Sequence, residues 1–483
     1  MNRKILYPVL FVLVLPLLLR FIWFFPGFVL PHTVATPDYA NLKYPVAPVS
    51  TPQVEPIKSL PGVVVVDYSH TNQFQTTEIQ TLVDALGQYG AQVELNSDST
   101  KLEGQLKNAS AYVVISPSAS FGPDEIQIMQ AFIARGGRMA VFTDPTRGEV
   151  IYDGNGNPTG NNSDANFVNP LLEPYGITTN GDYLYNLVEN EGNFRNVYFD
   201  SFQKSDLTQG LKKIVLYGAH SIETTSGAAL LIGNNTTFSS LTDAVPGNDT
   251  QKDWAAAALS KDGNVLAIGD FTFLMPPYNT VADNGLLINN ITSFLLTGKR
   301  TLELSEFPYI FNGTAVDVLP TSNVQMTADL LGGLSRLQKS FSLANTDITL
   351  VEKAIPGHNL IVLGTYSPST DLSTYTDPFH ITLDDFSEFV DVSGFGKVGR
   401  NGNGVLLFST GSGGNTLVLL ADTETDLASL MDTLSSGTLS GCVLQRKIAV
   451  CSIGAGGTFS VETPTPLLPA KTSPNTPGGT PGG

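Results

Sequence analysis

"VVVVDYSHTNQF", residues 63–74, is an apolar run that changes abruptly into polar residues after Val66. Four consecutive valines are typical of a strand that is buried on both faces of a sheet. The segment from Thr77 to Tyr89 carries apolar residues at helical spacing, and Gly90 ends it. A strand followed directly by a helix is the repeating unit of α/β folds with a parallel sheet.

The same alternation continues along the chain. A helix that opens at Pro123 and ends at Gly136–Gly137 is predicted between strands at 111–116 and 138–144. An Asn-rich and Gly-rich excursion follows from Pro145 to about Asn193. Apolar strands then resume, and a helix closes the domain; these elements are expected at 213–218, 228–233, 264–270 and 284–296. The prediction is an α/β domain over residues 61–300, with a parallel sheet covered on both faces.

After residue 300 the alternation starts again and predicts a second, smaller α/β domain over residues 301–460. Helices are expected at 326–341 and around Leu427 to Leu434, and strands at 347–352, 359–366, 404–410 and 416–422. A Pro-rich spacer is predicted over residues 31–60, and a disordered tail rich in Pro, Thr and Gly over residues 461–483.

The N-terminus predicts a membrane anchor within residues 1–30. The stretch from Ile5 to Leu30 is apolar apart from Arg20 and three prolines, and it is long enough to span a bilayer. Arg3 and Lys4 precede it, so the N-terminus is expected in the cytoplasm. The predicted localisation is the cell membrane, single-pass, with the bulk of the chain extracytoplasmic. Cleavage after residue 35 is the alternative to an uncleaved anchor.

Composition limits the classes of partner. Charged residues make up 14% of the chain and the formal net charge is -18, whereas proteins that bind nucleic acid concentrate Lys and Arg on one face. Nucleic acid is therefore excluded as a partner. The two cysteines, Cys442 and Cys451, bracket "CVLQRKIAVC", which predicts a tight hairpin. They form either a cross-strand disulfide or two buried free thiols.

Polar side chains stand at the ends of several predicted strands, where open parallel sheets bind ligands. Carboxylates and a His could hold a divalent cation, or a carboxylate could orient His70 as a base. The favoured interpretation is structural, because Asp, Ser and Asn at strand ends usually accept N–H groups of the next loop. No catalytic residue, metal or cofactor is therefore predicted. The ligand-binding candidates are Asp67, Ser69, His70, Asn72, Ser116, Asp144 and Asp270.

Three segments together resemble a known family: residues 63–74, residues 106–147 and residues 265–299. They are similar to uncharacterised bacterial membrane-anchored proteins of the class I glutamine-amidotransferase-like superfamily. That group is related to auxiliary subunits of gliding-motility-type ABC transporters and to intraflagellar-transport proteins. The likeness runs from residue 61 to residue 300, and it implies a flavodoxin-like or amidotransferase-like sheet domain there. Its motifs are an Asp-x-Ser-His-x-Asn turn, a Gly-Gly before a strand that ends in Asp, and a Gly-Asp followed by Asp283 and Asn284, which join the ligand-binding candidates.

The resemblance implies a protein without amidotransferase chemistry. Enzymes of that superfamily need a cysteine at a strand-to-helix elbow beside a His, and no cysteine lies before Cys442. Ser116 and Ser118 flank a proline and lack the Gly-x-Ser-x-Gly pattern. The leading hypothesis is a non-catalytic extracytoplasmic binding or assembly module, an accessory subunit of an ABC-type transporter or envelope complex.

Two alternatives to this hypothesis are open. One is an extracytoplasmic hydrolase that uses a crevice of Asp67, His70, Asp144 and Asp270. The other is an envelope protein whose tail meets the cell wall.

Two further patterns have simpler explanations. "GFGKVG" at 394–399 fits a dinucleotide-binding pattern, but a turn and a strand are expected after it instead of a helix. Residues 153–164 have calcium-loop spacing, yet Pro158 stands where glycine is required and Asp164 where glutamate is required. A solvent loop is the favoured interpretation there.

Overall fold

A computed structural model describes residues 3–24, 59–241, 253–311, 315–343, 346–411, 413–437, 439 and 441–454. The chain divides into two units, residues 1–56 and residues 57–483. The first unit contains helix α1 (Arg3–Phe24), which has Pro8 and Pro16 inside it. In the described ranges, no helix combines the length and apolarity that a membrane span requires. Most of the predicted spacer and all of the predicted tail lie outside the described residues.

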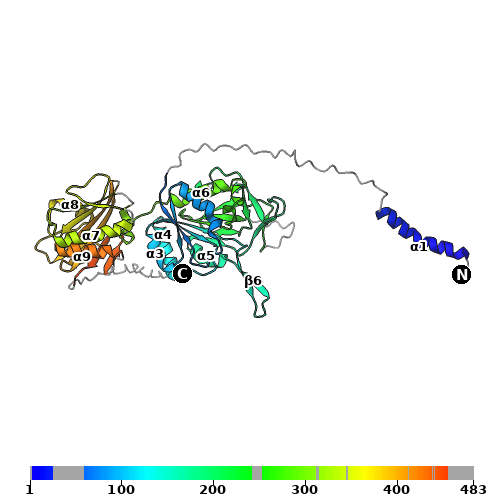
Figure 1. Cartoon of the computed structure of the whole chain (residues 1–483), viewed down its shortest axis with the longest axis horizontal. Coiled ribbons are helices and arrows are strands. Elements are labelled where there is room, and N and C mark those ends of the chain that lie inside the picture. Colours follow the sequence, from blue (N-terminus) through cyan, green and yellow to red (C-terminus); the bar gives the residue numbers. More distant parts are fainter. Residues whose placement is uncertain are drawn as a thin grey trace, which may run out of the picture. The chain divides into compact units, whose positions relative to one another are not determined.

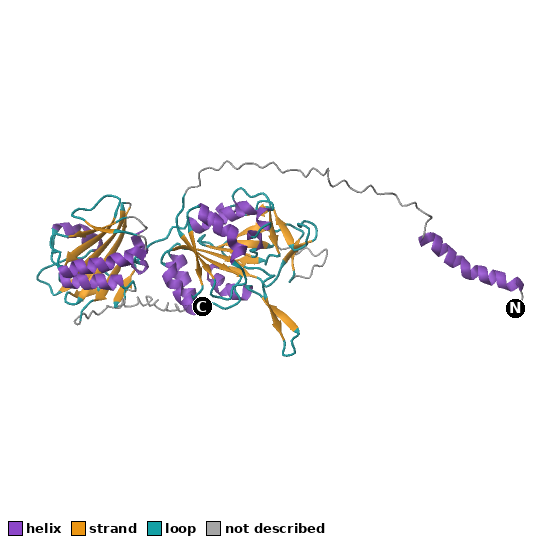
Figure 2. Ribbon diagram, in the orientation of Figure 1, coloured by secondary structure: helices purple, strands orange, loops and turns teal. Residues whose placement is uncertain are grey.

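The second unit contains two large sheets, of eight and seven strands (Figures 1 and 2). The first follows the order β10-β13-β15-β16-β4-β3-β1-β2. Five neighbouring strands are parallel: β16 (Val265–Ile268), β4 (Arg138–Phe142), β3 (Ala109–Ile115), β1 (Val63–Asp67) and β2 (Gln92–Asn96). Three antiparallel strands complete the sheet: β15 (Ala255–Leu259), β13 (Ala228–Ile232) and β10 (Ser201–Phe202).

The four valines of β1 show why this sheet is buried on both faces. Successive side chains of a strand point to opposite faces. Val64 and Val66 pack in the core beneath α2 (Gln80–Gln88) and α6 (Asn284–Leu296), and Val63 and Val65 pack in the core on the other side. Figure 1 shows α6 on one side and α3, α4 and α5 on the other. The bounds of these three helices are α3 (Leu102–Leu106), α4 (Pro123–Ala134) and α5 (Ala165–Leu172).

The predicted α/β class is confirmed, but the wholly parallel sheet was wrong at one edge. Strand β15 was missed because its sequence, AAAAL, has no strand-forming preference of its own, and tertiary pairing determines its conformation.

The excursion at 145–193 was also predicted without elements, yet it contains α5, whose apolar pattern Pro170 interrupts. The excursion also contains the strands β5 (Glu149–Tyr152), β6 (Pro158–Asn162), β7 (Ile177–Thr179) and β8 (Leu184–Asn186). Four more short strands follow it: β9 (Asn196–Phe199), β11 (Ile214–Tyr217), β12 (Ile222–Thr224) and β14 (Thr237–Ser239).

The second sheet has the order β18-β17-β19-β23-β22-β25-β24. Its first four strands are parallel and its last three antiparallel: β18 (Ile348–Leu350), β17 (Val316–Pro320), β19 (Asn359–Thr365), β23 (Gly414–Ala421), β22 (Asn403–Gly411), β25 (Ile448–Ser452) and β24 (Cys442–Gln445). Helices α7 (Ala328–Leu343) and α9 (Glu424–Ser435) share one core with it. On its other face lie α8 (Thr370–Thr376) and a hairpin of β20 (Phe389–Val392) and β21 (Gly396–Gly399). The "GFGKVG" segment is therefore part of a hairpin and precedes no helix.

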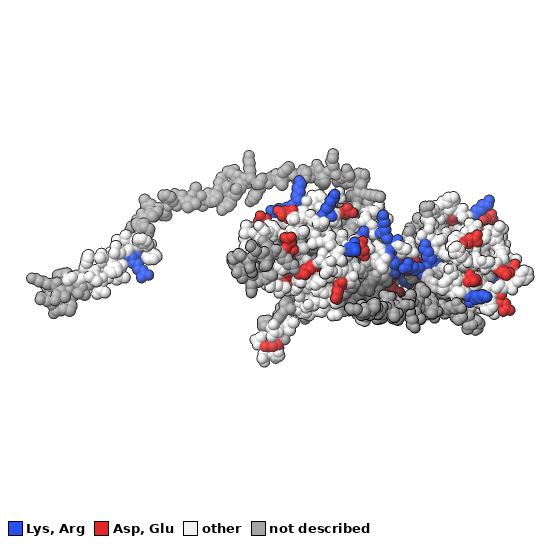
Figure 3. All heavy atoms as spheres, turned by 180° about the vertical axis from the view of Figure 1, so that it is seen from behind, with Lys and Arg blue, Asp and Glu red and all other residues white. Residues whose placement is uncertain are grey.

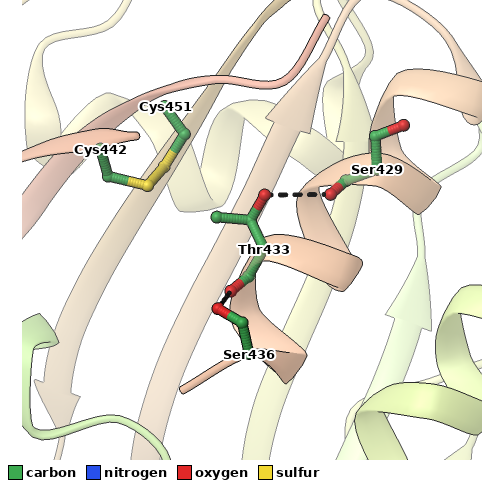
Figure 4. The surroundings of a disulfide bond; sticks show 5 residues. All are labelled: Ser429, Thr433, Ser436, Cys442 and Cys451. Carbon is green, nitrogen blue, oxygen red and sulfur yellow. Dashed lines mark hydrogen bonds between the residues drawn. A yellow bond between two sulfur atoms is a disulfide. The ribbon is translucent and has the colours of Figure 1, made fainter. Parts of the chain in front are cut away.

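A disulfide joins Cys442 and Cys451 (Figure 4). The two residues are directly paired across β24 and β25, with their Cα atoms 3.9 Å apart. Cys451 is fully buried in the same core as Leu430 and Leu434 of α9. The bridge thus ties the last hairpin of the second sheet into its core.

Candidate functional site

The first polar cluster surrounds Asp67, the last residue of β1. Its carboxylate is fully buried and lies 3.0 Å from each of four side-chain atoms: Ser69 Oγ, His70 Nδ1, Asn72 Nδ2 and Tyr112 Oη. Burial by itself raises the pKa of Asp67, but the hydrogen bond and charge of His70 outweigh it, so the pKa lies below its ordinary value. Asp67 therefore remains ionised and holds the turn that follows β1.

His70 is packed inside this cluster. Only 4% of the residue is exposed, and its ring stacks on Phe121 with centroids 3.7 Å apart. Nδ1 contacts Asp67, and Nε2 lies 3.2 Å from Glu125 Oε1. Burial alone lowers the pKa of His70, but the two carboxylates raise it above its ordinary value. A His with both nitrogens occupied and only 4% of its surface exposed fits the structural interpretation and lacks the access that a general base needs.

The second polar cluster begins at Ser116, directly after β3. Ser116 has a φ of 38°, which is uncommon for a residue other than glycine, and its side chain is fully buried. Its Oγ donates to Asp164 Oδ2 at 2.7 Å, and the same oxygen accepts the N–H of Asp144 at 2.8 Å. Asp164, from the start of α5, therefore ties together the ends of β3 and β4.

The cluster continues inward through His220. Its Nε2 lies 3.0 Å from Asp164 Oδ1, and the residue is 1% exposed. Its Nδ1 is 4.0 Å from Asp182 Oδ1 and has no hydrogen-bond partner within the described residues. The order of contacts is Ser116, Asp164, His220. Because the carboxylate stands between the serine and the histidine, His220 does not contact the Ser116 hydroxyl that a base would have to deprotonate.

Asp144 and Asp270 form the buried end of the same cluster. Asp144 accepts hydrogen bonds from Thr146 Oγ1 at 2.6 Å and Thr272 Oγ1 at 2.9 Å. Asp270 accepts the N–H groups of Tyr217 at 2.8 Å and Thr272 at 2.7 Å. Burial, and then the charge of Asp144, raise the pKa of Asp270 to about 7. Both carboxylates are fully buried, and their oxygens accept hydrogen bonds from this chain's own donors.

Asp283 and Asn284 lie at the start of α6 and fasten it to β11. Asp283 Oδ2 accepts the N–H groups of Lys212 and Lys213 at 2.7 and 2.9 Å. Asn284 accepts the N–H of Val215 and donates to its carbonyl, both at 3.0 Å, as a neighbouring strand would. These two candidates belong to neither polar cluster.

The calcium-loop spacing at 153–164 does not produce a common site. Asp153 accepts the N–H groups of Asn155 and Asn157 at the tip of the β5–β6 hairpin. Asp164 is 2% exposed and binds Ser116 and His220. Over the part of the chain that the structure describes, no group of three or more His, Cys, Asp or Glu side chains is placed to hold a metal ion.

Sequence reasoning missed several residues that complete these clusters, among them Glu125, Asp182 and His220. His220 follows β11 in the segment "GAHS", a strand end of the same kind as that after β1. Extending the strand-end rule to that segment would have found it. Glu125 and Asp182 carry no comparable pattern, because their partners are distant in the sequence.

Comparison with known proteins supports the family resemblance in part. Residues 61–241 match a family model described as an ABC-type uncharacterized transport system. The mmIFT52 N-terminal domain is 16% identical, with a TM-score of 0.38, and the match covers 50% of this chain and all of that domain. Thua-like proteins from Bacteroides uniformis and Parabacteroides merdae are 12% and 9% identical, with TM-scores of 0.31 and 0.29. These two matches cover 50% and 51% of this chain and 94% and 93% of theirs. No curated protein matches the chain.

Proposed function

We propose that this chain is a non-catalytic, membrane-anchored extracytoplasmic module that binds or assembles components of an ABC-type transporter. One observation carries the proposal: the polar residues at the carboxyl ends of the first sheet are buried and bonded to one another. Asp67, Ser116, Asp144 and Asp270 are all fully buried, and His70 is 4% exposed. The match of residues 61–241 to an ABC-type transport family supports the transporter as the partner.

A hydrolase is the competing function, and the geometry argues against it. A serine nucleophile needs a base within hydrogen-bond reach and an accessible hydroxyl. Ser116 Oγ donates to the carboxylate of Asp164 and is fully buried. The His70 ring is enclosed by Asp67, Glu125 and Phe121. Neither side chain is placed to meet a substrate.

The anchor is proposed from the sequence alone. Residues 5–30 are apolar except for Arg20 and the prolines. This apolar stretch extends beyond α1, which ends at Phe24. Apolar area exposed to water costs about 25 cal/mol per Å². A bilayer would cover this area, and the basic residues before it favour an extracytoplasmic body.

Affinity capture of the full-length tagged chain from solubilised membranes tests the proposal. We expect membrane subunits of an ABC-type transporter to copurify with it. The control carries residues 1–60 on an unrelated folded reporter, so that it keeps the anchor and loses the body. Equal recovery of transporter subunits with both proteins would contradict a role for the body.

A hydrolase screen of wild type, His70→Ala and Ser116→Ala supplies the complementary test. No turnover is expected from any of the three. Turnover by wild type that disappears in a well-folded variant would establish the enzyme instead.

A further inference from the structure

A second feature lies at the amino ends of the parallel strands of the first sheet, opposite the carboxyl ends where the polar clusters lie. A cavity of about 770 Å³ is bordered by Val63, Gln92 and Ala109, which begin β1, β2 and β3. It is therefore separated from the buried polar clusters by the length of the strands. Its volume lies within the range of small-molecule sites.

The charged residues that line this cavity are all basic. Lys107, Lys299 and Arg300 line it, and its described lining includes no acidic residue. This is unusual in a chain with 44 acidic and 26 basic residues. Figure 3 shows Lys and Arg gathered in one area of the visible face, whereas Asp and Glu are scattered. A cleft lined by one sign of charge concentrates ligands of the other sign.

Internal pairing neutralises only part of this charge. Glu306 is 1% exposed; it is bonded to Arg300 and lies 3.5 Å from Arg135 Nε. Arg300 also donates to the carbonyls of Lys107 at 3.3 Å and Ala109 at 2.5 Å. The Nε atoms of Arg300 and Arg135 are buried and have no hydrogen-bond acceptor among the described residues. The single carboxylate of Glu306 thus balances only part of the charge of Arg300 and Arg135, and Lys107 and Lys299 add further positive charge.

Part of the remaining lining is apolar or aromatic. Leu302, Pro308 and Tyr309, all partly exposed, supply it next to polar residues such as Gln92 and Asn108. Such a wall favours a ligand with a ring or an aliphatic portion, because that portion loses contact with water on binding. A simple inorganic anion would leave this wall uncovered.

We propose that this cavity binds a small organic anion, whose charged group meets Lys107 and Lys299 and whose apolar portion lies against Leu302 and Tyr309. This site goes beyond the assembly role and does not depend on it. A phosphate, sulfonate or carboxylate can supply the charge, since both lysines recognise an anion as point charges.

Fluorescence titration with anilinonaphthalene sulfonate tests the site on the full-length chain in neutral detergent. Wild type should bind this probe at least about tenfold more tightly than Lys107→Gln/Lys299→Gln, a loss of about 1.4 kcal/mol. The matched control is Lys212→Gln/Lys353→Gln, which removes two exposed lysines that do not line the cavity. Its affinity should stay within about twofold of wild type, and higher salt should weaken wild-type binding.

Two comparisons between charged and neutral ligands test whether the cavity requires an anionic group. Neutral N-phenylnaphthylamine, which has the rings without the sulfonate, should bind wild type at least about tenfold more weakly than the sulfonate. Naphthyl phosphate should displace the probe, and naphthol should not. Unchanged binding by Lys107→Gln/Lys299→Gln, or equal binding of the neutral amine, would overturn the proposal. If the double variant does not fold, Lys299→Gln alone serves, because Lys299 is exposed.

Discussion

Replacing Asp67 by alanine is the sharpest test of the buried polar clusters. The change removes one partner of a buried ion pair with His70 and leaves the Tyr112 hydroxyl, which is fully buried, without its acceptor. Breaking a buried pair in this way costs about 3 to 5 kcal/mol of unfolding free energy. Asn72 keeps its second bond, to the carbonyl of Ile115. We therefore expect a loss of about 3 to 5 kcal/mol, without larger rearrangement.

Urea unfolding followed by tryptophan fluorescence measures this loss. The chain has two tryptophans, and Trp254 is 9% exposed in the core of the first sheet. A Trp23→Phe background makes Trp254 the only reporter. Asp98→Ala is the matched control, because Asp98 accepts equivalent local bonds from Thr100 at an exposed site. Little change is expected for that control.

The pH dependence of the unfolding free energy gives a second test of the Asp67–His70 pair. The pKa of Asp67 is lowered, so its contribution is present above an unfolded value of 3.8 and is lost as pH falls through the folded pKa. The pKa of His70 is raised, so its contribution is complete below 6.5 and is lost as pH rises through the folded pKa. The difference between wild type and Asp67→Ala should therefore be largest between about pH 4 and 6.5. A variant as stable as wild type throughout this range would refute the structural role of Asp67.

Three further changes have defined outcomes. Asp270 has a folded pKa of about 7, so its contribution is complete below 3.8 and is lost as pH rises toward 7; urea titrations should show Asp270→Asn with a flatter stability profile than wild type over that window. Replacing Cys442 and Cys451 by serine should cost about 2 to 3 kcal/mol, seen as a lower midpoint in calorimetry, and added reductant should reproduce the shift in wild type alone. Gly136→Ala should lower the thermal midpoint strongly, because the new Cβ would lie 2.2 Å from the carbonyl oxygen of Lys299; Gly156→Ala has a similar positive φ and open space around it, and should lower the midpoint much less.

The sequence predicted most helices and strands because their patterns are local. Helix α6 was predicted at 284–296 and is observed at those residues, since its apolar spacing is regular. The antiparallel edge could not be predicted in the same way. Four alanines in β15 suit a helix as readily as a strand, and their pairing with β13 and β16 depends on residues distant in the sequence.

The candidate residues were found by the same kind of local pattern. Their exposure to solvent, however, depends on segments that are distant in the sequence. Polar residues such as Asp67 and Ser116 are common at the ends of strands, whether or not a ligand reaches them. What decides access here is the long segment between β4 and β15, which supplies Asp164 and His220 to the cluster at Ser116. Asp164 accepts from a serine 48 positions away and contacts a histidine 56 positions away. Such distant pairs leave no periodic pattern in the sequence. The sequence therefore placed these polar groups at the carboxyl ends of the strands but could not show that they bind one another. Because the chain itself occupies the carboxyl ends of these strands, the ligand site proposed above lies at their amino ends, where Lys107, Lys299 and Arg300 line a cavity.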